Sequence, residues 1–324
     1  MNETRVFPAR LADSAASCED GRVLAFGDAL QEAALAGRAP TRAPREDLAV
    51  VAVAGVDARD FLHAQVAANL KPLQPGQSVL TAWCSPKGRV LFLITVIASG
   101  AGEFRLLLAR DQAAALAKRL RMFVLRAAVT VDELGDHGVI SLDDCGVPPS
   151  LPDDVLAGAE TAGRTWLTGP ASSLAACWDA LPGTPIGELA ASLVDIRRQR
   201  PRLTAELGDQ FLPQELDLDE HAGVSFDKGC YPGQEIIARV RFRGSVKRRL
   251  AHMVFDGTVP PPPGARLVAG GTETARGTVL LAAQRDATHG ELLCVRDLEA
   301  ADVRLADRPA VTLERVDHGD GPDA

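Results

Sequence analysis

The chain has 324 residues, of which 46% are hydrophobic and 24% are charged, and its formal net charge is -8. This length predicts a soluble globular protein of two or three domains. The negative charge argues against a general nucleic-acid binder but leaves local basic patches open. No apolar run approaches the roughly 20 residues of a membrane-spanning helix, and the N-terminus lacks the apolar core of a signal peptide. We therefore expect a cytoplasmic protein without membrane contact.

The first part of the chain predicts an α+β layer. Residues 36–47 are small, charged and proline-bearing, which is typical of a linker, so we expect 1–45 to be an N-terminal segment and linker. The pattern then predicts a strand at 48–54, a helix capped by Asp57, three strands within 78–109, a helix at 111–123 and a strand at 126–131. This order is typical of an antiparallel sheet with helices on one face.

The rest of the chain predicts a second, weaker α+β pattern and then a β-rich end. The expected elements are short strands near Leu142 and Trp166, helices at 170–181 and 186–198, and a long irregular segment at 201–231. An irregular segment of this length is usually functional or disordered, and its many apolar residues argue against disorder. From residue 248 onward, several short β segments indicate a small barrel or sandwich. We therefore place one region at 46–247, with an approximate split near 135, and another at 248–324.

Six cysteines are scattered along the chain without a C-x-x-C pair: Cys18, Cys84, Cys145, Cys177, Cys230 and Cys294. This spacing fits neither a disulfide framework nor a zinc site, and no thiol cluster predicts an iron–sulfur centre held by this chain. We expect mostly idle thiols in a reducing compartment and no metal bound by this chain alone.

The stretch FDKGCYPGQEIIARVRFRG, residues 226–244, places Cys230 beside Tyr231, the single tyrosine of the chain. Pro232 suits the first turn of a helix, which makes Tyr231 the predicted N-cap. Gly229 and Gly233 leave backbone exposed around the thiol. We expect Tyr231 to orient this turn or to donate a hydrogen bond at the site, rather than to fill a core.

The charge around Cys230 favours a reactive thiol. Residues 226–249 hold seven basic and two acidic side chains, and both cations and a helix N-terminus stabilise a thiolate. The same residues also suit a cysteine that merely fits a tight turn. Composition alone favours neither the reactive thiol nor the structural cysteine.

A second basic run, RRQRPR at 197–202, reads in isolation as a solvated helix end. Together with the run at 239–249 it would also suit an anion, such as a phosphate, a carboxylate tail or a nucleic-acid backbone. The chain lacks the P-loop, the G-x-S-x-G motif and the H-E-x-x-H motif.

The residues Lys228-Gly229-Cys230-Tyr231-x-Gly233-Gln234-Glu235, continued by Ala238-Arg239 and Phe242-Arg243-Gly244, closely resemble the signature of the YgfZ family. These are folate-binding proteins related to the T-protein, the aminomethyltransferase of the glycine cleavage system. The stretches GVDARDFLHAQVAANL, CSPKGRV and FLPQELDLDEHAGVSF extend the resemblance over roughly residues 46–316. The chain departs from the family at Arg198-Gln199-Arg200-Pro201, where a small Ala-Gly step is usual before the proline.

The resemblance implies an α+β fold, with two interleaved T-protein-like folate-binding domains and a small C-terminal β-barrel around a central folate pocket. It also implies tetrahydrofolate as cofactor, a role in the assembly or repair of iron–sulfur clusters in client enzymes, and a link to tRNA modification. The expected partners are folate and iron–sulfur enzymes or their assembly machinery. The family's functional cysteine corresponds to Cys230.

Two sets of side chains are expected around this chemistry. The first set shapes the site of Cys230 and consists of Lys228, Gly229, Tyr231, Gly233, Gln234, Glu235 and Arg239. The second set would hold the folate and consists of Arg198, Arg200, Gln214, Arg241 and Arg243. We expect the folate cavity to be lined by the 201–231 segment and by Cys230.

Two alternatives stay open. A true aminomethyltransferase carries an aspartate after the corresponding hairpin, but the hairpin PKGRVLFL has no carboxylate to serve as a general base. This absence, with the added cysteine, favours an assembly factor over an aminomethyltransferase. The other alternative is a non-catalytic RNA- or protein-binding module that uses the two basic runs.

Overall fold

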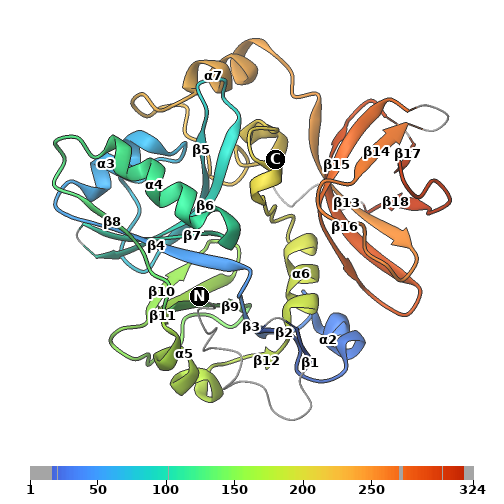
Figure 1. Cartoon of the computed structure of the whole chain (residues 1–324), viewed down its shortest axis with the longest axis horizontal. Helices are drawn as coiled ribbons and strands as arrows, with labels where there is room; N and C mark the ends of the chain where they lie inside the picture. The colour runs from blue at the N-terminus through green and yellow to red at the C-terminus, as the bar shows by residue number, and fades with distance from the viewer. Residues whose placement is uncertain (1–16, 20, 101, 270–272, 301, 317–324) are drawn as a thin grey trace.

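The structure is a computed structural model that describes residues 17–19, 21–100, 102–269, 273–300 and 302–316 (Figure 1). Its first sheet is antiparallel, in the order β5-β6-β7-β4-β8. The elements are β4 (Leu48–Ala54), α3 (Ala58–Gln65), β5 (Ser78–Cys84), β6 (Val90–Gly100), β7 (Glu103–Ala109), η1 (Arg110–Gln112), α4 (Ala113–Phe123) and β8 (Thr130–Glu133). The predicted strands and helices are confirmed here, and β8 begins four residues later than the sequence indicates. Asp57 stands at the N-cap of α3, but its side chain makes no cap hydrogen bond and instead accepts from Ala128 N–H at 2.7 Å.

The second sheet has the order β10-β11-β9-β3-β12. Its elements are β3 (Thr41–Pro44), β9 (His137–Asp143), β10 (Leu156–Ala159), β11 (Arg164–Pro170), α5 (Ala171–Cys177), η2 (Trp178–Ala180), β12 (Thr184–Pro185) and α6 (Glu188–Arg197). Ahead of it lie β1 (Ser17–Glu19), β2 (Arg22–Ala25) and α2 (Ala29–Leu35). The expected linker at 36–47 is wrong, because β3 pairs with β9 on one side and β12 on the other. Residues 1–16 of that predicted segment lie outside the described residues.

The two sheets are interleaved along the chain and pack against each other. The chain enters the second sheet with β3, builds the whole first sheet, and returns with β9 (Figure 1). Gly158 on β10 touches Ile97 on β6 so closely that an added Cβ would lie 2.6 Å from Ile97 Cγ2. Ala159 N–H also donates to Gly76 O across the junction, at 2.8 Å. The α+β region is therefore one packed body.

The C-terminal part is a six-stranded sheet that curls on itself (Figure 1). Its order is β17-β14-β15-β16-β13-β18. The strands are β13 (Arg248–Asp256), β14 (Arg266–Ala269), β15 (Ala275–Gln284), β16 (His289–Asp297), β17 (Val303–Leu305) and β18 (Leu313–Arg315). Helix α6 joins this sheet to the α+β region through an ion pair of 2.7 Å between Arg197 and Glu291. The expected fold class is confirmed.

An irregular segment runs between the sheets from α6 to α7 (Gln234–Arg243), interrupted by η3 (Ala205–Leu207) and η4 (Pro213–Leu216). Its apolar residues Phe211, Leu216 and Leu218 are buried, as an ordered segment requires. No helix among the described residues is long and apolar enough to cross a membrane.

Candidate functional site

A cavity of about 340 Å³ lies between the two sheets of the α+β region. We call it the inter-sheet cavity. Its walls come from the loop before β5, from β5, from the turn after β10, and from the irregular segment that follows α6. Its lining residues include Asn69, Gln77, Leu80, Glu160, Arg164, Arg198, Arg200, Leu216, Leu218 and His221. The volume falls within the range of small-molecule sites.

The polar wall of the inter-sheet cavity centres on Glu160. Its carboxylate accepts hydrogen bonds from Trp166 Nε1 and Arg200 Nη1, both at 2.7 Å. Arg200 also donates to Thr95 Oγ1 at 2.6 Å, and its guanidinium lies 5.0 Å from the Trp166 ring centre. Arg164 is buried, and its Nη2 has no hydrogen-bond partner among the described residues. The wall therefore offers an acceptor and a spare donor to a polar ligand.

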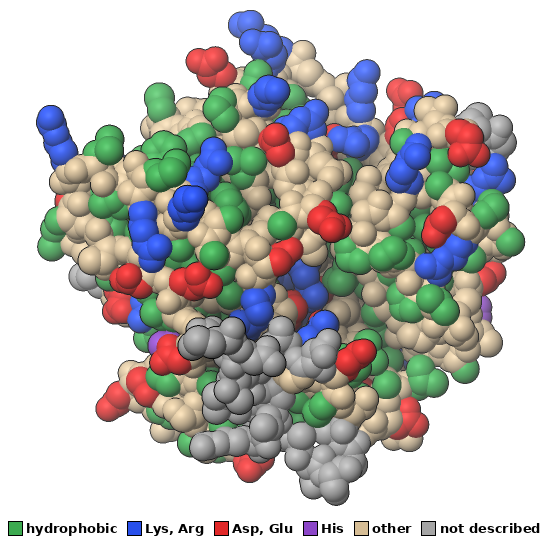
Figure 2. Space-filling view, viewed as in Figure 1, with side chains coloured by type: hydrophobic (Ala, Val, Ile, Leu, Met, Phe, Trp, Pro, Cys, Tyr) green, Lys and Arg blue, Asp and Glu red, His purple; other side chains and the backbone are tan. Residues whose placement is uncertain are grey.

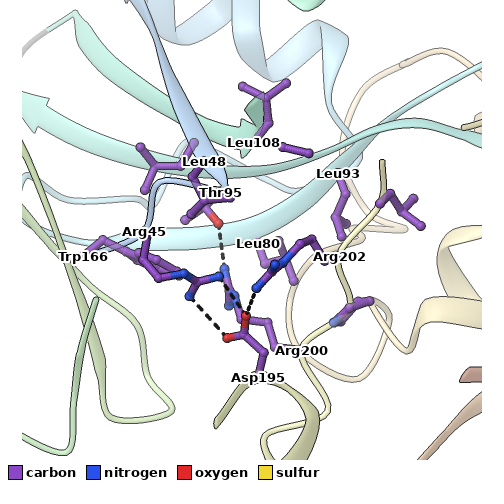
Figure 3. Close-up of a pocket in the computed structure, with 14 residues that line it drawn as sticks. Arg45, Leu48, Leu80, Leu93, Thr95, Leu108, Trp166, Asp195, Arg200 and Arg202 are labelled. Carbon is purple, nitrogen blue, oxygen red and sulfur yellow. Dashed lines mark hydrogen bonds and ion pairs between the residues drawn. The ribbon is translucent and has the colours of Figure 1, made fainter. Parts of the chain in front are cut away.

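Behind this wall lies a buried network of charges (Figure 3). Asp195 on α6 accepts from Arg164 Nη1 at 2.6 Å, from Arg45 Nη2 at 2.8 Å and from Arg202 Nη2 at 2.9 Å. Burial alone would raise the pKa of Asp195, but these three guanidinium groups hold it far below its usual range. The network fixes α6 and the following segment to β11 and to the connection between β3 and β4.

The basic run at 197–202 is part of the interior rather than a solvated helix end, so that expectation is wrong. Arg198 pairs with Asp144 at 2.7 Å, Arg200 pairs with Glu160, and Arg202 pairs with Asp195. These arginine side chains are only 14–19% exposed. The run is used for internal ion pairs and is no longer a candidate anion-binding surface.

The five expected folate-binding residues are not brought together. Arg198 and Arg200 line the inter-sheet cavity. Gln214 is buried elsewhere and donates to Ile237 O at 2.8 Å, while Arg241 and Arg243 are exposed on α7. Cys230 does not line the cavity either, although the 201–231 segment does. The cavity and the thiol are therefore separate sites, although the irregular 201–231 segment contributes to both.

Helix α7 begins later than the sequence predicts. Its N-cap is Gly233, with a φ of 81°, and its first residue is Gln234, so Tyr231 is not the N-cap. Tyr231 is 7% exposed and belongs to the main core, and its hydroxyl has no hydrogen-bond partner among the described residues. The expectation that Tyr231 orients the turn rather than fills a core is wrong, and burial raises the pKa of its phenol.

Lys228 holds the loop before α7 in place. Its ammonium group donates to the carbonyl oxygens of His63, of Val66 at 2.7 Å and of Ala68 at 2.9 Å, so it binds the C-terminal end of α3. It also lies 5.0 Å from the Tyr231 ring centre. Burial lowers the pKa of Lys228 to about 8. Lys228 thus positions the loop and is not directed at the thiol.

Cys230 and Cys18 are exposed, whereas the other four cysteines are buried or half-buried. Burial raises the pKa of Cys84 and Cys294 to about 12 and also raises the pKa of Cys145 and Cys177. Within the described ranges, Cys230 has no hydrogen-bond or ion-pair partner. Glu235 and Arg239 are four residues apart on α7, but no ion pair forms between them in the described part of the chain. The thiol is open to solvent and to a partner molecule.

Gly233 and Gly229 provide a matched pair for testing this loop. We expect Gly233→Ala to lower the free energy of unfolding by about 3 kcal/mol, because its φ is left-handed and its Cβ would lie 2.5 Å from Ser85 O and 2.7 Å from the Gly88 α-carbon. Gly229→Ala should cost about 1 kcal/mol or less, because no atom lies within 4 Å of its added Cβ. Urea unfolding followed by circular dichroism measures both, and equal losses would contradict this structure of the loop.

Several cavity residues escape sequence reasoning. Glu160 and Arg164 flank the turn between β10 and β11, while Asn69 lies about 90 residues earlier in the sequence, so only the packing of the two sheets brings Asn69 beside the other two. His221 stands out only because it falls in the irregular segment. In the described residues, no group of three or more His, Cys, Asp or Glu side chains is arranged to hold a metal ion.

Comparison with solved structures identifies the fold. No protein-family model matches the chain. The structure is similar to the crystal structure of the glycine cleavage system aminomethyltransferase T from Bartonella henselae, with a TM-score of 0.71, 17% sequence identity and coverage of 93% of each chain. The chain therefore has the T-protein fold.

The relatives found by sequence narrow the comparison from a fold to a family. The chain is 29% identical over 265 residues to the tRNA-modifying protein YgfZ of Cronobacter sakazakii, and this alignment covers 74% of this chain and 80% of that protein. It is 27% identical over 263 residues to the tRNA-modifying protein YgfZ of an Enterobacter species, with the same coverage. The resemblance to the YgfZ family is confirmed.

Proposed function

We propose that this protein binds a reduced folate in the inter-sheet cavity and presents the Cys230 thiol for the assembly or repair of iron–sulfur clusters in client enzymes. The observation that carries the proposal is the cavity itself, a ligand-sized space of about 340 Å³ with a carboxylate and guanidinium groups on one wall. The tRNA-modifying relatives support clients whose own activity modifies tRNA.

The residues of the cavity fit a folate. The Glu160 carboxylate would accept from the N–H groups of a pteridine ring, since each of its oxygens keeps a free lone pair. The unpaired Nη2 of Arg164 would donate to a ring or carboxylate oxygen. Leu80, Leu216 and Leu218 supply an apolar wall for the flat ring. When bound, a reduced folate supplies one-carbon carrier chemistry at N5 of its ring and at the neighbouring N10.

The segment that forms one wall of the cavity also leads to the thiol. Leu218 and His221 line the cavity, and the chain continues from them through Lys228 to Cys230. A ligand that packs against this segment would stabilise the loop that Lys228 fixes to α3. The exposed Cys230 would then bind an iron atom of a cluster held by the client, forming a sulfur–iron bond while the thiol proton leaves to solvent.

An aminomethyltransferase is the less supported alternative. In the hairpin after Ser85, Arg89 donates to Gln210 O and no carboxylate faces a ligand among the described residues. Glu160 is the one carboxylate that lines the inter-sheet cavity in the described part of the chain, and it is already paired with Arg200. A general base for proton transfer needs a free carboxylate within hydrogen-bond reach of the substrate.

Folate binding is testable by calorimetry with 5-formyltetrahydrofolate, a stable reduced folate. We expect Glu160→Gln to weaken binding by about tenfold or more, because a hydrogen bond to a charged group is worth about 1.5–3 kcal/mol. Glu133→Gln, at an exposed position on β8, removes the same charge away from the cavity and should bind like the wild type. Absence of binding at millimolar folate would reject the folate proposal. Equal affinity of the two variants would place the ligand elsewhere.

A further inference from the structure

Helix α7 exposes an unusual group of side chains. Arg239, Arg241 and Arg243 are all exposed, and Phe242 between them is 71% exposed. Lys247 follows the helix, and Lys87 lies beside it, because neighbouring Gly88 packs against Ile236. We call these six residues the α7 surface: Lys87, Arg239, Arg241, Phe242, Arg243 and Lys247. Figure 2 shows Lys and Arg side chains along the upper edge of this face, where Figure 1 draws α7.

The arginines of the α7 surface are free of ion pairs in the part of the chain that the structure describes. Arg248 and Arg249, from the same basic run, pair with Glu215 and Asp217 at 2.8 Å. By contrast, none of the three arginines of α7 pairs with a carboxylate in the part of the chain that the structure describes. In a chain of net charge -8, unpaired arginines concentrated on one helix indicate a polyanionic ligand.

Phe242 is held in place although it faces solvent. Its ring packs edge-to-face with Phe226, with ring centres 5.9 Å apart and planes inclined by 73°. The guanidinium of Arg241 lies 5.6 Å from the Phe226 ring centre. An exposed and anchored aromatic ring among arginines is the arrangement on which single-stranded nucleic acids stack their bases.

We propose that the α7 surface binds single-stranded RNA, with phosphates on Arg239, Arg243 and Lys247 and a base stacked on Phe242. Arg239 and Arg243 are four residues apart, so they lie on one face of the helix and can contact neighbouring phosphates. A protein partner fits less well, because a protein interface has an apolar core depleted of charges, and Phe242 is the one large apolar side chain exposed on α7. This proposal does not rest on the folate or the thiol.

The test is fluorescence anisotropy with a labelled single-stranded RNA of mixed sequence, measured over a range of salt concentrations. We expect Arg239→Ala/Arg243→Ala to weaken binding at low salt and to reduce the slope of log affinity against log salt by about 1.4, since each phosphate contact contributes about 0.7 for single strands. Phe242→Ala should weaken binding by about tenfold and leave the slope unchanged, because stacking releases no counterions.

The control is Lys118→Ala/Arg126→Ala, which removes two exposed positive charges on and after α4. It should bind RNA almost like the wild type, and all variants should keep the wild-type circular dichroism spectrum. Equal losses in the two double variants, or an unchanged affinity in Phe242→Ala, would overturn the proposal. Polyglutamate binding as tightly as RNA and without dependence on Phe242 would also overturn it and would identify an acidic protein as the ligand.

Discussion

Replacing Asp195 by alanine should lower the free energy of unfolding by about 3–5 kcal/mol, which is a large part of the stability of a typical protein. The carboxylate accepts from three guanidinium groups, those of Arg45, Arg164 and Arg202. Arg45 and Arg164 are 2% and 1% exposed, so both would keep buried charges with fewer partners. Urea unfolding followed by tryptophan fluorescence measures the loss, since Trp166 lies beside the network.

Asp132→Ala is the matched control. This aspartate side chain is 66% exposed, and its ion pair with Arg121 is long, at 3.9 Å. Its loss should be within about 0.5 kcal/mol. The pH dependence gives a second check. The folded pKa of Asp195 is depressed, so its stabilising contribution is complete at neutral pH and falls as the pH drops below the unfolded value of about 3.9. A loss below 1 kcal/mol in Asp195→Ala would contradict the described network.

Cys230→Ser should abolish the maturation of iron–sulfur client enzymes while leaving the fold intact. The side chain is exposed and makes no contact that serine would lose, so the melting temperature should stay within a degree or two. The activity of a client enzyme, measured in a host strain that lacks its own protein similar to this chain, gives the functional readout. Cys18→Ser is the control, since Cys18 is the other exposed thiol, and it should support maturation fully.

Alkylation followed by mass spectrometry tests the thiols themselves. Cys230 should label fastest at pH 7, while Cys84 and Cys294 should resist because burial raises each pKa to about 12. Full client maturation by Cys230→Ser would remove the thiol from the proposed function. Labelling of Cys230 no faster than Cys18 would show that exposure alone governs its reactivity.

The sequence predicts the parts of this fold that depend on neighbouring residues. The strand at Leu48–Ala54, the hairpin turn at 85–88 and helix α6 follow from local patterns of apolar and turn residues. The signature around Cys230 likewise locates the exposed thiol and the glycine with positive φ. These predictions hold because the spacing of apolar residues and the identity of turn residues are both determined within a few neighbouring positions.

The parts that fail depend on partners far along the chain. Residues 41–44 have the composition of a linker, yet they form a strand because β9 and β12 supply hydrogen bonds on both sides. Arginines at the end of α6 look solvated until Asp143, Asp195 and Glu160 are placed beside them. Glu160 has no local signal at all, because the cavity exists only once two sheets have packed.

The threading of β3 also sets an order of events during synthesis. The ribosome delivers β3 before any strand of the first sheet, but its neighbours β9 and β12 emerge only after that sheet is complete. Until then β3 presents unpaired backbone groups on both edges, which is a site for mispairing. The first sheet, which depends on no later strand of the second, can form meanwhile. A nascent chain that folds in this order would have a complete first sheet while β3 is still unpaired, and an unpaired strand edge makes such an intermediate prone to aggregation.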